Sequence, residues 1–178
     1  MTRHLLVFAS LALASAAFGQ INASGSIGFA PSGASTAYDI TLRNTGTTTI
    51  GTLWYAWIPG QDYLPIAPSS IVSPAGWTFT QTTSAGFGYG LRWVAPAGGA
   101  IAPGASLSGF GFTTTTTVGE LSGDSIFGTH PPVGTSFVYE GGPFVGGSRQ
   151  IVINPTPEPG SLAALAMGIV VLRRRRRQ

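Results

Sequence analysis

The chain contains no cysteine, and this absence narrows the chemistry open to it. Without thiols there are no disulfides, no thiol nucleophile and no thiolate metal ligand. Lysine is absent as well, so every basic residue is an arginine. Charged residues make up only 8% of the sequence, whereas glycine and proline contribute 26 and 13 residues. Glycine, proline, serine and threonine interrupt short apolar runs throughout, which favours short strands and turns over long helices.

Histidine and the carboxylates are too few and too scattered to form a recognisable motif. His4 lies near the N-terminus, and His130 lies in a Gly-Thr-His-Pro-Pro loop, so neither a zinc site nor a catalytic triad is indicated. The carboxylates are widely spaced in the sequence. This is better explained by their keeping the surface soluble than by the catalytic carboxylate pair of a glycosidase. A calcium site remains an alternative for Glu120 and Asp124, because oxygen-rich loops suit that ion. We expect no cofactor, no metal and no enzymatic activity.

The N-terminus has the layout of a secretory signal peptide. A short positive segment, Met1 to His4, precedes a run of apolar and small residues from Leu5 to Phe18. Small residues then permit cleavage, either after Gly19 or at Ala14-Ser15-Ala16, and we favour cleavage after Gly19. Residues 1–19 are therefore predicted to be removed on export.

Most of the positive charge lies at the two ends of the chain. The formal net charge is +3, but Arg3 and the run from Arg173 to Arg177 belong to the terminal segments. Residues 20–154 keep only three arginines (Arg43, Arg92 and Arg149) against a larger set of carboxylates, namely Asp39, Asp62, Glu120, Asp124 and Glu140. This region is mildly acidic and offers no basic face to nucleic acid. A region of this length fits one domain that can bury a core without disulfides.

Residues 20–154 are predicted to form an all-β domain. The segment from Ile50 to Ile58 is the most hydrophobic strand, with Leu53, Tyr55 and Trp57 on one face and Trp54 on the other. Residues 59–76 are expected to form a long proline-containing loop. The predicted strands are Gly25–Phe29, Tyr38–Arg43, Ile50–Ile58, Trp77–Thr80, Tyr89–Val94, Ala105–Thr114, Ser136–Tyr139 and Gln150–Ile153.

Two features of the strand pattern concern particular residues. Asn44-Thr45-Gly46 predicts a turn, because glycine readily adopts a positive φ. Leu107 and Phe110 fall on opposite faces of one predicted strand, and a β-bulge near Gly109 would bring them to the same face.

Two short segments resemble the strand and turn pattern of bacterial Ig-like and fibronectin-III-like domains. They are Tyr-Asp-Ile-Thr-Leu-Arg-Asn-Thr-Gly at residues 38–46 and Ile-Ala-Pro-Gly-Ala-Ser-Leu at residues 101–107. The resemblance implies a single antiparallel β-sandwich, of Ig-like or jelly-roll type, and nothing about activity. We predict this sandwich over residues 20–154, between the signal peptide and a C-terminal segment of residues 155–178.

The C-terminal segment combines three features in a fixed order. Pro157-Glu158-Pro159 comes first, an uncharged run from Gly160 to Leu172 follows, and Arg173 to Arg177 come last. As a helix the uncharged run reaches roughly 20 Å, less than the bilayer core of about 30 Å, so it is a marginal membrane span. Arginines hold their end of a span on the cytoplasmic side. The two prolines prevent a helix from continuing backwards.

This layout resembles the PEP-CTERM sorting signal of Gram-negative bacteria. The resemblance implies that Pro157, Glu158 and Pro159 form the recognition motif of an exosortase-type membrane protease, and that Arg173, Arg174, Arg175, Arg176 and Arg177 form the cytoplasmic anchor. It further implies transient attachment to the inner membrane, followed by a cell-surface or extracellular location. Many members of the family accompany exopolysaccharide production. A plain tail anchor would explain the apolar run and the arginines but not the Pro-Glu-Pro motif.

The tryptophans provide the main functional lead in the central domain. On an exposed, flat sheet face they would stack sugars, as in many carbohydrate-binding modules, or contact another protein. Tryptophan is largely buried on average, which favours a core role. We therefore expect a non-enzymatic structural protein of the cell surface or extracellular matrix. A module that binds exopolysaccharide is the alternative, and a secreted hydrolase is a second. The candidate carbohydrate-binding residues are Trp54, Trp57, Trp77 and Trp93.

Overall fold

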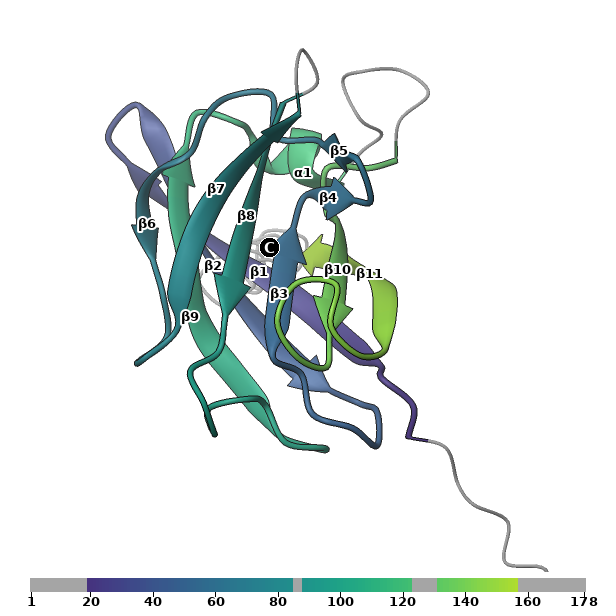
Figure 1. Ribbon diagram of the computed structural model, residues 1–178. Helices are drawn as coiled ribbons and strands as arrows, with labels where there is room; N and C mark the ends of the chain where they lie inside the picture. Colours follow the sequence, from purple (N-terminus) through teal and green to yellow (C-terminus); the bar gives the residue numbers. More distant parts are fainter. Residues whose placement is uncertain (1–18, 85–87, 123–130, 157–178) are drawn as a thin grey trace, which may run out of the picture.

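Short segments rich in threonine, valine, isoleucine and aromatic residues form the strands of the domain, as these side chains pack well on a pleated surface. The computed structural model (Figure 1) describes residues 19–84, 88–122 and 131–156. The predicted signal peptide up to residue 18 and the predicted sorting signal from residue 157 lie outside the described residues. The elements are β1 Ala23–Ser32, β2 Ser35–Asn44, β3 Thr52–Tyr55, β4 Trp57–Ile58, β5 Gln61–Asp62, β6 Ser69–Val72, β7 Thr78–Ser84, β8 Gly88–Val94, β9 Ser106–Thr114, α1 Val118–Ser122, β10 Thr135–Tyr139 and β11 Ser148–Pro155.

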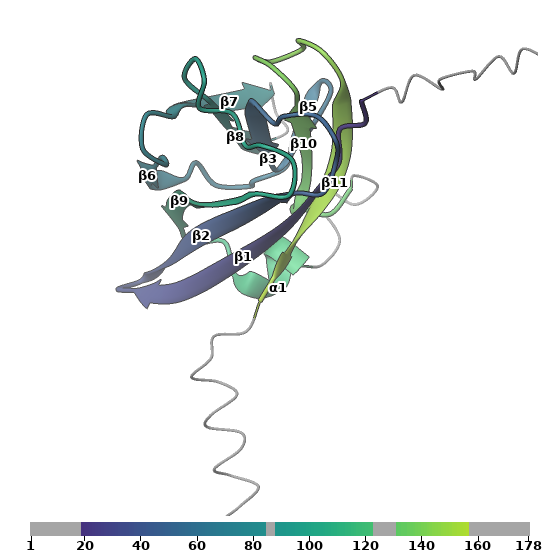
Figure 2. The same cartoon turned by 90° about the horizontal axis from the view of Figure 1, so that it is seen from below.

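One continuous sheet of nine strands folds back on itself in the order β6-β9-β2-β1-β11-β10-β3-β8-β7, and β4 pairs separately with β5. Strands β6, β9, β2 and β1 form one layer, and β10, β3, β8 and β7 form the other. Strand β11 belongs to both, because its first part pairs with β10 and its last residues pair with β1. Figure 2 shows the two layers facing each other. The all-β, sandwich-like architecture predicted from the sequence is confirmed.

One ladder corrects the prediction of a wholly antiparallel sandwich. Strands β1 and β11 run parallel, with Gly25 opposite Ile153 and Ile27 opposite Pro155. Parallel neighbours need a long crossover between them, and nearly the whole domain separates β1 from β11 in the sequence. The pairing therefore could not be inferred from any local pattern.

The open side of the sandwich lies between the edge strands β6 and β7. Trp93, on β8, donates a hydrogen bond from its indole Nε1 to the carbonyl of Val72 on β6, at 2.9 Å. The same ring packs against Phe110 on β9, with 5.6 Å between ring centroids. This buried side chain ties one layer to the other at their free edges, so the sheet is nearly closed.

The predicted strand Ile50–Ile58 is interrupted. Strand β3 ends at Tyr55, and Ala56 adopts a left-handed φ of 54°. The chain then turns into β4, which pairs with β5. Residues 59–76, predicted to be a loop, therefore contain β5 and β6. Both strands are too short or too irregular to give the alternating pattern by which a strand is recognised.

The predicted bulge near Gly109 is present. Ile40 lies opposite Phe110 whereas Leu42 lies opposite Leu107, so β9 contains one extra residue between these pairs. Gly109 has a φ of 92°, which glycine adopts at little cost. As predicted, the bulge places Leu107 and Phe110 on the core side of β9.

Asn44 organises the turn predicted at residues 44–46. Its side chain is fully buried and donates from Nδ2 to the carbonyls of Thr48, at 2.7 Å, and Ile101, at 2.9 Å. The backbone N–H of Gly46 donates to its Oδ1 at 3.0 Å. Gly46 does not adopt the positive φ expected from the sequence; glycine is needed there because a side chain would collide with the backbone of Gln20 and Asn22. One amide group thus holds the turn and connects it to a segment far along the chain.

Within the described residues, no helix is long and apolar enough to cross a membrane.

Candidate functional site

The four tryptophans separate into two pairs. Trp77 and Trp93 belong to the central core, where both rings pack edge-on against Phe110. Trp54 and Trp57 belong to a second cluster on the outer face of the β3–β10 layer. None of the four is more than 6% exposed. The flat, exposed aromatic face considered from the sequence is therefore not formed by these residues, and the expectation that most of them are buried holds.

Trp54 and Trp57 stack face to face. Their ring centroids are 3.6 Å apart and their planes differ by 1°. In an uninterrupted strand these two residues would point to opposite faces. The left-handed conformation of Ala56 reverses this and turns Trp57 back over Trp54. The sequence pattern wrongly placed Trp57 with Leu53 and Tyr55 because it contains no signal for that break.

Phe144 covers the tryptophan pair from the loop between β10 and β11. Its ring lies edge-on to Trp54, Trp57 and Tyr139, with centroid distances of 5.6, 5.8 and 5.6 Å. The residue is nevertheless 66% exposed and adopts a left-handed φ of 64°. We call Trp54, Trp57, Tyr139, Phe137 and Phe144 the aromatic cluster. Sequence reasoning overlooked Phe144, although two glycine pairs, at 141–142 and 146–147, flank its loop.

Glu140 fixes the base of this loop. The backbone N–H of Gly147 donates to its carboxylate at 2.9 Å, and the N–H of Glu140 donates to the carbonyl of Gly147 at 3.0 Å. The hydrogen bond from the backbone N–H of Gly147 lowers the pKa of Glu140. The carboxylate therefore stays ionised in mildly acidic solution and keeps holding the loop.

A buried carboxyl group lies beside the aromatic cluster. Asp62, 2% exposed, accepts hydrogen bonds from the hydroxyls of Thr82, at 2.6 Å, and Ser84, at 2.8 Å. The Thr82 hydroxyl in turn accepts one from the indole Nε1 of Trp54 at 3.1 Å. Burial raises the pKa of Asp62, and the two hydroxyl groups act against that rise. A side chain at Gly90 would collide with this carboxyl group, so the glycine makes room for it.

Arg92 extends the cluster toward β7. Its guanidinium carbon lies 5.1 Å from the centroid of the Trp54 ring, within the range of a cation–π interaction. Its terminal nitrogen lies 3.5 Å from the hydroxyl of Thr80. Within the described part of the chain, its buried Nε has no hydrogen-bond partner. The guanidinium group is thus held mainly by the aromatic ring.

The remaining candidate residues do not gather at this site. Glu120 closes the first turn of α1, where its carboxylate accepts from the N–H of Thr117 at 2.6 Å and from the Thr117 hydroxyl at 2.9 Å. This is a capping box, so the described contacts of Glu120 stabilise the start of the helix. Asp124 and His130 lie outside the described residues. Among those described, no three histidine, aspartate or glutamate side chains lie close enough to share a metal ion.

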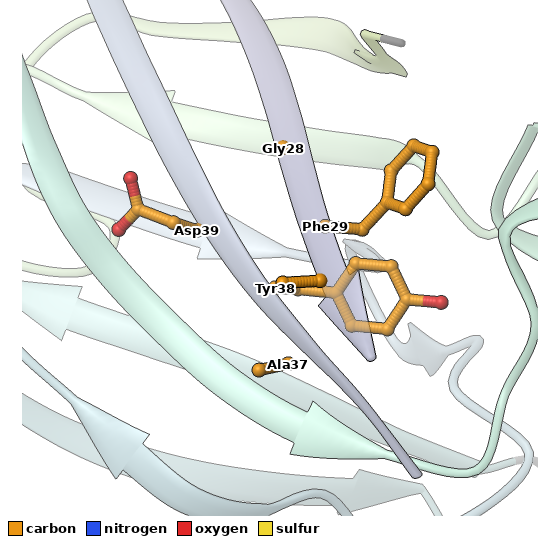
Figure 3. A pocket seen from close by; sticks show the side chains of 6 residues that line it. Gly28, Phe29, Ala37, Tyr38 and Asp39 are labelled. Atoms are coloured by element: carbon orange, nitrogen blue, oxygen red, sulfur yellow. The ribbon is translucent and has the colours of Figure 1, made fainter. Parts of the chain in front are cut away.

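Two open hollows lie along β1 and β2. One, of about 330 Å³, is lined by Gly28, Phe29, Ala30, Ala37, Tyr38 and Asp39. Figure 3 shows the Asp39 side chain pointing away from the rings of Phe29 and Tyr38. The other, of about 390 Å³, is lined by Ser24, Gly25, Ser26, Thr41, Arg43 and Ser106. Both hollows are open to solvent rather than enclosed.

No protein-family model matches the sequence, and no curated protein matches it. Among solved structures, it is similar to an inactive mutant of a GH20 exo-β-N-acetylglucosaminidase from Vibrio harveyi, with a TM-score of 0.40 and 13% identity. That match covers 76% of this chain and 18% of the enzyme, so the chain spans under a fifth of the enzyme's length. It is also similar to a CBM3 of Hungateiclostridium clariflavum, with a TM-score of 0.37, 11% identity, and coverage of 55% of this chain and 73% of that one. Similarity this low assigns no family and no function.

Proposed function

We propose that the β-sandwich is a non-enzymatic structural domain of the cell surface or extracellular matrix. In this proposal a signal peptide exports the domain, and an exosortase-type membrane protease processes it at the C-terminal sorting signal. The observation that carries the proposal is that Gln20 and Thr156, which adjoin the two predicted processing segments, are both hydrogen-bonded into the domain.

At the N-terminal end of the described residues, Gln20 is hydrogen-bonded to Thr47. Its N–H donates to the hydroxyl of Thr47 at 2.8 Å, and the N–H of Thr47 donates to its carbonyl at 2.8 Å. Gln20 is the first residue that would remain after cleavage following Gly19. Export would therefore leave these contacts of the domain intact.

At the C-terminal end of the described residues, Thr156 is hydrogen-bonded to Ile27. Strand β11 ends at Pro155, and Thr156 then donates to the carbonyl of Ile27, from its N–H at 2.9 Å and from its hydroxyl at 3.3 Å. Pro157, the first residue of the proposed recognition motif, follows directly. Cleavage at or beyond this motif would therefore leave the hydrogen bonds of Thr156 to the domain intact, which is the support that this end of the chain gives to the proposal.

The carboxylates with described contacts support a non-enzymatic role. Asp62 accepts hydrogen bonds from two hydroxyl groups, Glu120 caps α1, and Glu140 fixes the loop that carries Phe144. Each of them thus serves the fold.

Carbohydrate binding, the alternative, has weaker support. A sugar stacks on an accessible ring face, but Trp54 and Trp57 cover each other and Phe144 covers their edges. Side chains that pack on the pair, such as Arg92 over Trp54 and Phe137 against Trp57, would have to move before either ring could take part. A structural role requires no such rearrangement.

The test is intact mass and membrane fractionation of the native protein, compared with Glu158→Ala. We expect the wild type to lose Arg173 to Arg177 and to leave the membrane, and the variant to remain uncleaved in the membrane. Asp39→Ala, which removes an exposed carboxylate within the domain, is the control and should behave like the wild type. If the wild type also keeps its arginines and stays in the membrane, the tail is only an anchor and the proposed processing is wrong.

A further inference from the structure

The two edge strands of the sheet differ in how well they are protected against pairing with another chain. Natural proteins protect sheet edges with short strands, bulges, prolines or charges. Strand β6 has only four residues, an irregular register and a left-handed Ser70 with a φ of 48°. Strand β7 has seven residues, Thr-Phe-Thr-Gln-Thr-Thr-Ser, all in unbroken register with β8. It contains no charge and no proline, so it has none of these protections.

The direction of the backbone groups of β7 follows from the neighbouring strand. The N–H and C=O of Tyr89, on β8, bond to Leu64 on the side away from β7. In an antiparallel ladder, a residue whose N–H and C=O point away from the neighbouring strand lies opposite a residue whose N–H and C=O also point away. Thr83 lies opposite Tyr89, and Gln81 and Phe79 follow at every second position. The backbone N–H and C=O of Phe79, Gln81 and Thr83 therefore face the open edge.

Apolar side chains are exposed on the same side of the molecule. Phe79, on β7, is 48% exposed, and Val72, on β6, is 55% exposed. Phe79 lies opposite Trp93, whose indole bonds to the carbonyl of Val72. The two side chains thus flank one buried ring where the sandwich is open, and Figure 1 shows β6 and β7 along this side.

We propose that β7 pairs antiparallel with β7 of a second copy of this chain, about a two-fold axis at Gln81. In this register Gln81 faces its own copy, Phe79 faces Thr83, and Thr80 faces Thr82. Every outward N–H and C=O of Phe79, Gln81 and Thr83 then finds a partner, because the strand is symmetric in the spacing of these groups about Gln81. With no charge on the strand, two copies meet without repulsion.

The pairing predicts a closed dimer. Each copy contributes the same edge, so the contact is isologous and does not propagate into a fibre. This inference goes beyond the proposed structural function and stands on the geometry of β7 alone. It holds whether or not the C-terminal segment is processed.

Single cysteines test the register, since the natural chain has none. Opposed residues of an antiparallel pair have Cα atoms about 4.5–5.5 Å apart, within reach of a disulfide. The Gln81→Cys protein is purified from its host and oxidised at a concentration of about 10 μM, well below the millimolar effective concentration within a dimer. We expect it to form a disulfide-linked dimer. Phe79→Cys and Thr83→Cys should each fail to link alone and should link when mixed, because each faces the other across the axis.

Val152→Cys is the control for random collision. Val152 is 48% exposed, similar to Phe79, but lies on β11, which has neighbouring strands on both sides. Thiols held together in a dimer experience a millimolar effective concentration, so Gln81→Cys should link roughly 100-fold faster than Val152→Cys. Equal rates for the two variants, or linkage of Gln81→Cys only to a different protein, would overturn the proposal.

Gln81→Pro and Gln81→Ala provide a second, independent test. The N–H of Gln81 points away from β8, so proline there removes an edge donor and leaves the β8 ladder bonds in place. Sedimentation of Gln81→Pro should show monomers at a concentration where the wild type and Gln81→Ala are dimers, with unchanged circular dichroism. Monomeric wild type, or dimeric Gln81→Pro with native dichroism, contradicts pairing through β7.

Discussion

Asp62 allows two opposing electrostatic effects to be weighed against each other. Burial penalises its ionised form, whereas the hydroxyls of Thr82 and Ser84 favour it. Burial is the larger effect, and the pKa is raised above its ordinary value of 3.8. The informative change is Asp62→Asn, which removes the charge and keeps an oxygen that can accept from Thr82.

The pH dependence has a definite sign. Because the folded state holds the proton of Asp62 more tightly than the unfolded state, the wild type gains stability as pH falls through the raised pKa. The gain is complete below about 3.8, the ordinary pKa of the group. Asp62→Asn has no such proton, so its stability relative to the wild type should fall on acidification. At neutral pH, Asp62→Asn loses a hydrogen bond to a charged group, which costs about 1.5–3 kcal/mol, but it also removes the cost of burying the charge. We therefore expect the free energy of unfolding to change by about 1 kcal/mol or less.

The assay is urea denaturation of both proteins from pH 7 to pH 3.5. All other carboxylates are common to the two proteins, so the difference between their free energies of unfolding isolates Asp62. We expect this difference to shift in favour of the wild type as pH falls. A difference that is independent of pH would show that the hydroxyl groups balance the effect of burial, and a difference that moves the other way would show that they outweigh it. Either result would refute the reasoning.

Three further substitutions test the fold and the aromatic cluster. Asn44→Ala leaves the carbonyls of Thr48 and Ile101 without their side-chain donor and should cost about 2–4 kcal/mol, measured by urea denaturation. Phe144→Ala removes edge contacts of a mostly exposed ring, so it should lower the free energy of unfolding by only about 1 kcal/mol. It should also change the near-ultraviolet circular dichroism of the tryptophan pair. A loss of stability as large as that of a core aromatic residue would contradict this placement. Gly109→Val forces a branched side chain into a left-handed conformation and should cost about 1–3 kcal/mol, seen as a lower melting temperature.

The sequence pattern was sufficient to predict a structural feature where the residues that cause it are neighbours in the chain. The alternation in Tyr38 to Arg43 predicted part of β2, and the opposite parities of Leu107 and Phe110 predicted the bulge. The segment 44–46 predicted the turn, although Gly46 does not have the positive φ on which that prediction was based. In each case the residues that decide the structure are neighbours in the sequence. Hydrophobic periodicity and glycine conformation act at that range.

Contacts between distant segments could not be predicted in the same way. The break at Ala56, an ordinary residue in a left-handed conformation, has no sequence signal and decides where Trp57 points. Phe144 lies far along the chain from Trp54, although their rings touch. The parallel pairing of β1 with β11 likewise joins opposite ends of the domain. The make-up of the aromatic cluster depends on the fold as a whole.

The absence of cysteine can be connected to how the sandwich is held together. Buried side chains bond to backbone carbonyls of remote segments, as Tyr38 does to Thr116 at 2.7 Å, Thr52 to Gly141 at 2.7 Å, and Trp93 to Val72 at 2.9 Å. Each such bond adds about 1 kcal/mol, less than the 2–5 kcal/mol that a native disulfide commonly supplies in a small secreted domain. Several of them, spread over both layers, substitute for one covalent crosslink. Unlike a disulfide, these hydrogen bonds depend on no oxidant.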